Sequence, residues 1–158
     1  MEKIASFTID HLRLLPGLYV SRKDREGDVT VTTFDLRFTA PNREPAVEQP
    51  ALHTIEHLGA TYLRNCEIKD KVVYFGPMGC RTGFYFIVRD AVTPQQAIDL
   101  TRDALAFCAA FEGEIPGASE KECGNWRDHD LAGAKREAAA MCDVLQNWTP
   151  DKLAYPTK

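Results

Sequence analysis

The segment His53-Thr54-Ile55-Glu56-His57 constrains the fold more than any other part of the chain. A helix turns by about 100° per residue, so imidazoles four residues apart lie on one of its faces. Glu56 shares that face and offers a carboxylate beside the imidazoles. The spacing predicts a helix over residues 50–64 that presents either a metal site or a set of hydrogen-bonded polar side chains.

Two of the five cysteines lie in local sequences that are unusual for buried thiols. Cys80 lies in Pro-Met-Gly-Cys-Arg-Thr-Gly, and Cys123 is followed by Gly-Asn-Trp-Arg-Asp-His-Asp. In contrast, Cys108 and Cys142 fall within apolar periodic runs, where cysteine behaves as a core residue. The odd count and the lack of any Cys-x-x-Cys pair argue against a disulfide framework, a zinc ribbon and a thioredoxin-type site. We therefore expect reduced thiols at Cys80 and Cys123 that can bind metal or react.

The composition bounds the class of protein. A length of 158 residues with 44% hydrophobic content suits one well-buried core, so we expect a single domain over residues 1–158. The net charge is -4 and the basic residues form no stripe, which argues against a nucleic-acid partner. No apolar run approaches the roughly 18 residues that span a bilayer, and the first residues lack a secretory-signal pattern. We expect a cytoplasmic protein with no membrane partner.

Helices and short strands alternate along the sequence. β-branched and aromatic runs predict strands over residues 28–38, 71–75 and 83–89. In the first of these, Phe34, Leu36 and Phe38 alternate, so Arg37 points to the opposite face of the sheet. Apolar periodicity predicts further helices over residues 94–112, which a capping box opens and Gly113 ends, and over residues 130–148. The expected fold is α+β, with a mostly antiparallel sheet covered by helices and with Cys80 in a hairpin-like turn.

Three separate motifs, in this order, resemble S-ribosylhomocysteine lyase, the LuxS family. They are His-Thr-Ile-Glu-His-Leu at 53–58, Pro-Met-Gly-Cys-Arg-Thr-Gly-Phe-Tyr at 77–85, and Cys-Gly-Asn at 123–125 with Asp-His-Asp-Leu at 128–131. Ser6-Phe7, His11, the segment 34–38 and the length are also similar, so the resemblance spans nearly the whole chain.

The resemblance implies a metal site and a pair of acid–base groups. By it, His53, His57 and Cys123 bind one divalent metal per subunit and leave an open coordination position, as catalytic sites do. The family's native metal is iron(II), and zinc or cobalt also suits this ligand set. Cys80 and Glu56 are implied as the catalytic acid and base.

The resemblance also implies a substrate and an assembly. The reaction removes homocysteine from S-ribosylhomocysteine by two carbonyl shifts and a β-elimination, and it leaves 4,5-dihydroxy-2,3-pentanedione, the precursor of the autoinducer-2 signal. Ser6, His11 and Arg37 match pocket positions that bind the substrate. The family forms homodimers with sites at the interface, where Ser6 and His11 reach the partner's metal. One departure is Tyr-Phe-Gly at 74–76, where relatives commonly carry Asp-Ile-Ser, so recognition of the homocysteine end is expected to differ.

Two other readings of the ligand residues remain open from the sequence. His-x-x-Glu-His is also a metalloprotease pattern, although the best downstream ligand here is the thiolate of Cys123 rather than a carboxylate. Alternatively, His53, His57, Cys80 and Cys123 could form a closed structural zinc site in a binding module, in which Glu56 has no role.

Overall fold

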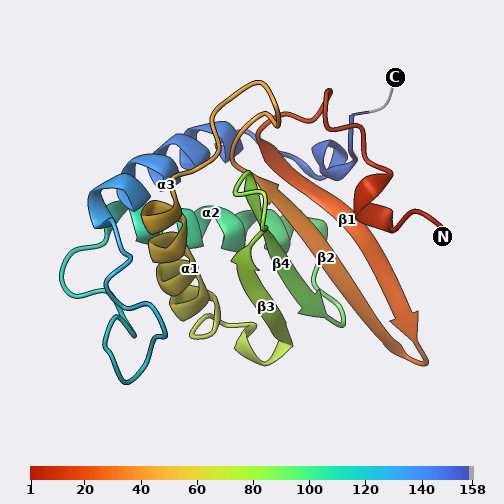
Figure 1. The fold of residues 1–158 in the computed structure, drawn as a ribbon. Coiled ribbons are helices and arrows are strands. Elements are labelled where there is room, and N and C mark those ends of the chain that lie inside the picture. Colours follow the sequence, from red (N-terminus) through yellow and green to blue (C-terminus); the bar gives the residue numbers. More distant parts are fainter. Residues whose placement is uncertain (157–158) are drawn as a thin grey trace.

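Residues 1–156 are described by the computed structural model, which has four strands and three α-helices (Figure 1). The strands are β1 (Gly17–Glu26), β2 (Val29–Arg37), β3 (Val72–Pro77) and β4 (Gly83–Arg89), and the α-helices are α1 (Gln49–Leu63), α2 (Pro94–Ala110) and α3 (Leu131–Leu145). Short 3-10 turns cover Ala5–Phe7, Lys69–Lys71 and Pro150–Leu153. All strand pairs are antiparallel, in the order β1-β2-β4-β3, which confirms the expected α+β class.

Strand β1 is the one sheet element that the sequence did not predict. Its second half is Ser-Arg-Lys-Asp-Arg-Glu and carries no alternating apolar residues. Pairing with β2, from Gly17 opposite Arg37 to Glu26 opposite Val29, makes this segment a strand. The charged half lies at the edge of the sheet, where charges suppress pairing with other chains.

Two helices end earlier than their periodicity predicts. Helix α2 stops at Ala110 because Phe111 already has extended backbone angles, so Gly113 lies in the loop rather than at the helix end. Helix α3 stops at Leu145, and Trp148 leaves the helix to donate a hydrogen bond from its indole to the carbonyl of Leu18, at 2.9 Å. The predicted capping box at the start of α2 is confirmed.

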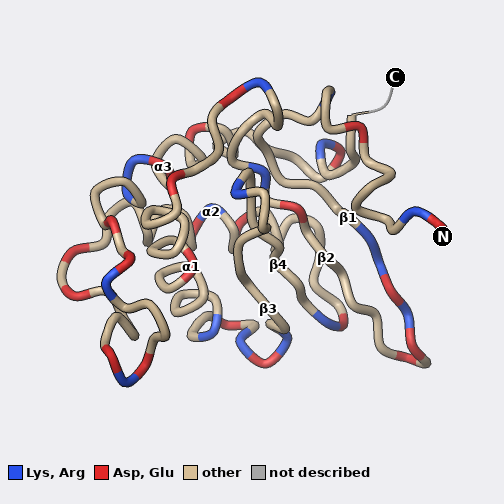
Figure 2. Tube along the Cα trace, viewed as in Figure 1, with Lys and Arg blue, Asp and Glu red and all other residues tan. Residues whose placement is uncertain are grey.

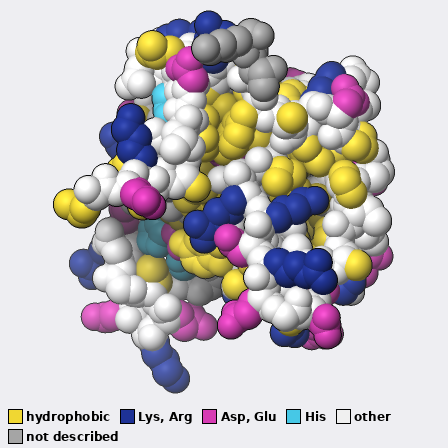
Figure 3. All heavy atoms as spheres, turned by 90° about the vertical axis from the view of Figure 1, so that its right-hand side faces the viewer, with side chains coloured by type: hydrophobic (Ala, Val, Ile, Leu, Met, Phe, Trp, Pro, Cys, Tyr) yellow, Lys and Arg dark blue, Asp and Glu magenta, His cyan; other side chains and the backbone are white. Residues whose placement is uncertain are grey.

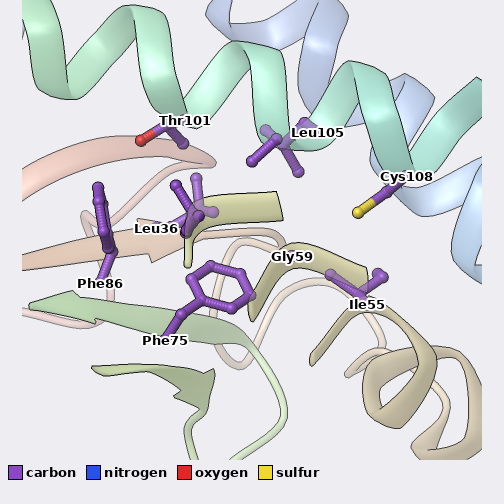
Figure 4. Close-up of a pocket in the computed structure, with 10 residues that line it drawn as sticks. Leu36, Ile55, Gly59, Phe75, Phe86, Thr101, Leu105 and Cys108 are labelled. Atoms are coloured by element: carbon purple, nitrogen blue, oxygen red, sulfur yellow. The ribbon is translucent and has the colours of Figure 1, made fainter. Parts of the chain in front are cut away.

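The core lies between one face of the sheet and the three helices. Figure 4 shows Leu36 and Phe75 of the sheet facing Leu105 of α2, around a cavity of only about 10 Å³. That volume is about one water-sized probe, so the interior is filled and holds no ligand site. A Cβ atom on Gly59 would lie 2.5 Å from Cε1 of Phe75, so glycine lets α1 approach β3 closely. The opposite face of α1 is thereby left to the histidines.

The surface outside the core is mixed in charge. Figure 2 shows acidic and basic residues interspersed along the chain, including the outer half of β1. Figure 3, which faces β1 and the N-terminal segment, shows apolar side chains gathered on that side. The exposed apolar residues of the N-terminal segment are Ile4, Phe7, Leu12 and Leu15. Within residues 1–156, no helix combines the length and apolar character needed to cross a bilayer.

Candidate active site

Four side chains converge beside helix α1 and could hold a metal ion. They are His53, His57, Cys123 and His129, and one ligand atom from each lies within 4.8 Å of the others. Nε2 of His53 and Sγ of Cys123 are 3.5 Å apart. The pair predicted on one face of the helix is thus joined by the predicted thiol from a loop 70 residues away.

The start of helix α3 fixes that loop against α1. The backbone N–H of Asp130 donates to Oγ1 of Thr54 at 3.0 Å and to the carbonyl of Pro50 at 3.2 Å. The Asp130 carboxylate in turn caps α3 by accepting from the N–H of Gly133 at 2.8 Å. These bonds tie the first turns of the two helices together and place residues 123–129 over the histidine face of α1.

Backbone carbonyls orient the two α1 histidines. Nδ1 of His53 lies 2.7 Å from the carbonyl of Asp128, and Nδ1 of His57 lies 2.7 Å from that of Pro116. A carbonyl can only accept, so each Nδ1 carries the proton and each Nε2 keeps a lone pair for a metal. Gly117 packs here with a φ of +72°, and a Cβ atom at that position would lie 3.3 Å from Nδ1 of His57. The loop before α3 therefore sets the tautomer of His57.

His129 is the site residue that the sequence reasoning missed. Its ring stacks on His53 with centroids 4.1 Å apart, and its Nδ1 lies 3.0 Å from Oγ1 of Thr54. Nε2 is buried and has no hydrogen-bond partner within residues 1–156. Burial and the neighbouring imidazoles of His53 and His57 lower the pKa of His129 to about 4, so the ring is neutral at pH 7. Its position six residues after Cys123 was the available signal.

The donor set fits a divalent transition metal. It combines neutral imidazoles with one thiolate-forming sulfur, which are ligands that zinc, cobalt and iron(II) accept. The carbonyl partners of His53 and His57 are the outer contacts that metal-bound histidines normally have. The orphaned Nε2 of His129 is a further polar atom that such an ion would satisfy.

Cys80 lies in a separate place, in the turn between β3 and β4. Arg81 has a φ of +57°, a conformation uncommon for a residue other than glycine, and its carbonyl accepts from the N–H of Val47 at 2.9 Å. The turn leaves Cys80 exposed, and Cys80 is not among the side chains that converge beside α1. A closed Cys2His2 zinc site made with Cys80 therefore lacks its fourth ligand in this arrangement.

Arg37 is buried, although taken alone the residue would read as a solvated strand position. Only 2% of it is exposed, and it pairs with Asp35 through contacts of 2.6 and 3.1 Å. Its Nη1 donates to Oγ1 of Thr82 at 2.6 Å, and this oxygen lies 3.1 Å from Sγ of Cys80. Burial raises the pKa of Cys80, but hydrogen bonds from Thr82 and the charge of Arg37 outweigh it and lower the pKa below that of an ordinary thiol.

Comparison with known sequences gives the family. A sequence model described as S-ribosylhomocysteinase (LuxS) matches residues 4–152. The chain belongs to the LuxS family. It is 56% identical to the S-ribosylhomocysteine lyase of Phocaeicola vulgatus over 160 residues, which cover 100% of this chain and 99% of the relative. It is 52% identical to the lyase of Clostridium acetobutylicum and 51% identical to that of Finegoldia magna, with 99% of each chain covered in both cases.

Membership of the LuxS family gives a setting for the residues that the structure leaves apart. Ser6 lies in the 3-10 turn Ala5–Phe7 and lines a surface hollow with Tyr85, while Nδ1 of His11 lies 2.9 Å from the carbonyl of Ile9. Within residues 1–156 neither side chain bonds to Cys80 or to the histidine cluster. The N-terminal segment runs beside β1, whereas α1 packs on β3 at the other edge of the sheet (Figure 1).

Glu56 and Tyr74 complete the comparison with the sequence prediction. Glu56 is half-buried on α1, and within residues 1–156 its carboxylate makes no hydrogen bond or ion pair, so it is free to accept a proton. Tyr74 lies on the edge strand β3 and folds its hydroxyl over Gly76, where any Cβ atom would collide with it. The substitution that distinguishes residues 74–76 from the usual family sequence is therefore a matched pair, because Tyr74 needs glycine at 76.

Proposed function

We propose that the protein is an S-ribosylhomocysteine lyase that forms L-homocysteine and 4,5-dihydroxy-2,3-pentanedione. The observation that carries the proposal is the presence, in one LuxS-family chain, of a convergent His/Cys metal cluster and a separate thiol with a lowered pKa. A metalloprotease would have no use for Cys80. Its product is the autoinducer-2 precursor, so we further propose roles in quorum sensing and in recycling a methylation by-product.

The bond that breaks explains why the site needs two kinds of group. A thioether leaves readily only when the neighbouring carbon can lose a proton next to a carbonyl. The sugar aldehyde is too far away, so two isomerisations first move the carbonyl inward along the chain. Each isomerisation takes a proton from one carbon and returns one to the neighbouring carbon or oxygen. The last step removes a proton and homocysteine, and the resulting enol becomes the diketone without water or an oxidant.

His53, His57 and Cys123 are the residues that we propose to hold the metal, with iron(II) as the native ion. When bound, a divalent metal supplies Lewis-acid polarisation of the substrate carbonyl. The carbonyls of Asp128 and Pro116 keep both imidazoles in the tautomer that offers Nε2. His129 closes the cluster on the side of the ring that it stacks against.

Cys80 and Glu56 are the proposed proton carriers. Sγ of Cys80 is accessible and has a lowered pKa, so a substantial thiolate fraction is available to take a proton from carbon. The Glu56 carboxylate projects from the same helix face as the metal ligands, which suits proton transfer near the polarised oxygen. Two carriers at different places allow protons to move on neighbouring carbons.

We propose that the active enzyme is a cytoplasmic homodimer and that Ser6 and His11 complete the partner's site. The support is their distance from their own histidine cluster, across the width of the sheet, together with the apolar surface formed by Ile4, Phe7, Leu12 and Leu15. Apolar patches of this kind mark interaction surfaces. The five free thiols suit a reducing compartment.

Mixed dimers test whether His11 acts across the interface. Co-expression of His11→Ala and Cys80→Ala chains with two different tags, followed by tandem purification, isolates the heterodimer. If His11 serves the partner's site, one site of the heterodimer is intact and turnover returns to about half that of the wild-type dimer. If His11 serves its own chain, each site lacks one residue and the heterodimer stays as inactive as its parents.

The lyase activity itself is tested by release of homocysteine from S-ribosylhomocysteine. Metal-loaded protein is incubated with substrate and quenched with acid, and the small molecules are separated from the protein before a chromogenic thiol reagent is added. Separation matters because Cys80 is exposed and the reagent would consume it. We expect one new thiol per molecule of substrate consumed. No thiol from folded, metal-replete dimer would refute the proposed function.

A further inference from the structure

A single hydroxyl group links the buried guanidinium of Arg37 to the thiol of Cys80. Nη1 of Arg37 donates to Oγ1 of Thr82 at 2.6 Å, and Oγ1 lies 3.1 Å from Sγ. A guanidinium can only donate, so Oγ1 must accept from it and keeps its one proton for another partner. Sγ occupies that position, so the geometry fixes the hydroxyl as the donor and the sulfur as the acceptor.

The rest of the Arg37 guanidinium is committed elsewhere. Its Nε and Nη2 bond to the two carboxylate oxygens of Asp35, which also accepts from the Tyr155 hydroxyl at 2.8 Å. Arg37 and Asp35 are almost fully buried and form a neutral pair. The field of a neutral pair falls off faster than that of a lone charge. The hydrogen bond from Thr82 is therefore the main route by which Arg37 favours a negative sulfur.

Thr82 is held too firmly to turn away from Cys80. The residue is 8% exposed, and its carbonyl accepts from the backbone N–H groups of Phe38 and Thr39 at 2.9 and 3.3 Å. A Cβ atom on the next residue, Gly83, would lie 2.5 Å from the carbonyl of Leu36, so the turn is pressed against β2. A donor fixed in this way stabilises charge without reorganising.

We propose that Thr82 is a positioning residue that keeps Cys80 as a thiolate, through a hydrogen bond whose direction is set by Arg37. The catalytic consequence rests on the proposed lyase function, because only there is the thiolate a base. The hydrogen bond itself is independent of any substrate. The two can therefore be tested separately.

The test is the pH dependence of alkylation of Cys80 by iodoacetamide, measured without substrate. Trypsin releases Cys80 in the peptide 72–81, which contains no other cysteine, so mass spectrometry follows this thiol alone. Thr82→Val removes the hydroxyl and keeps the shape, and it should raise the alkylation midpoint by about 1 to 2 pH units, as expected for a bond to a charged group. Thr82→Ser, the matched control, keeps the donor and should titrate close to wild type.

In the lyase assay the same shift should appear as a split between kinetic constants. At pH 7, Thr82→Val should lower kcat by about tenfold or more with little change in KM, because each pH unit changes the thiolate fraction tenfold. The acid limb of its pH profile should move upward by the alkylation shift. A normal alkylation shift with no lyase activity in wild type would refute the function and leave the hydrogen bond intact.

Two results would overturn the proposal. One is an unchanged midpoint in folded Thr82→Val, and the other is a serine variant that shifts as far as the valine variant. Circular dichroism establishes folding, because valine leaves Nη1 of Arg37 without its partner. If Thr82→Val does not fold, Thr82→Ala removes the same donor and leaves room for water beside Arg37, and the same two outcomes decide.

Discussion

His57→Ala is expected to lose bound metal and lyase activity together while the fold is retained. The imidazole supplies one of the converging ligand atoms, and its Nδ1 is already anchored to the Pro116 carbonyl. Loss of an outer contact of a metal ligand costs about 10- to 100-fold in metal affinity, so loss of the ligand itself should cost at least 100-fold. Elemental analysis after dialysis against a weak chelator measures the occupancy, and circular dichroism reports the fold.

His11→Ala is the matched control for this experiment. It also removes a half-buried imidazole, but one that lies outside the cluster within its own chain, so it should keep its metal. Wild type stripped of metal by a chelator should stay folded, because the apolar core is continuous without the site. Full occupancy in His57→Ala would contradict the assigned ligand set, and unfolding of stripped wild type would favour a structural metal.

Cys80→Ala is expected to keep its metal and its fold and to lose turnover. The side chain is exposed and lies outside the ligand cluster, so its removal disturbs neither packing nor coordination. General acid–base catalysis is worth about 10²- to 10⁴-fold, and kcat should fall by at least that amount. Homocysteine release and metal content, measured on the same preparation, test both halves of the prediction.

Cys66→Ser supplies the control for loss of a thiol. Cys66 is half-buried and donates to the carbonyl of Leu63 at 3.0 Å, a bond that serine can keep. Its turnover should match that of wild type. If Cys80→Ala loses metal as well as activity, Cys80 is a ligand, and the separation of thiol and metal site is wrong. Turnover that survives in Cys80→Ala would assign the proton transfers to Glu56 and another group.

Local patterns were sufficient for most of the regular structure. Apolar periodicity and the Thr93 cap gave α1 and the start of α2, and alternating apolar residues gave β2 and β4, because these signals depend on near neighbours in the chain. They failed where the deciding contact is distant. The charged strand β1 forms because β2 pairs with it, and α3 ends early because Trp148 bonds to Leu18.

The sequence by itself determined that His53 and His57 share a helix face and that Cys80 lies in a tight turn, since both follow from spacing of a few residues. It also supplied the three ordered motifs of the LuxS family. Only the tertiary structure decided that His129 joins the cluster, that Arg37 is buried, and that Thr82 stands between Arg37 and Cys80. Hydrogen bonds and desolvation act between groups that approach in space, and residues 37 and 82 approach only after β2 and β4 have paired.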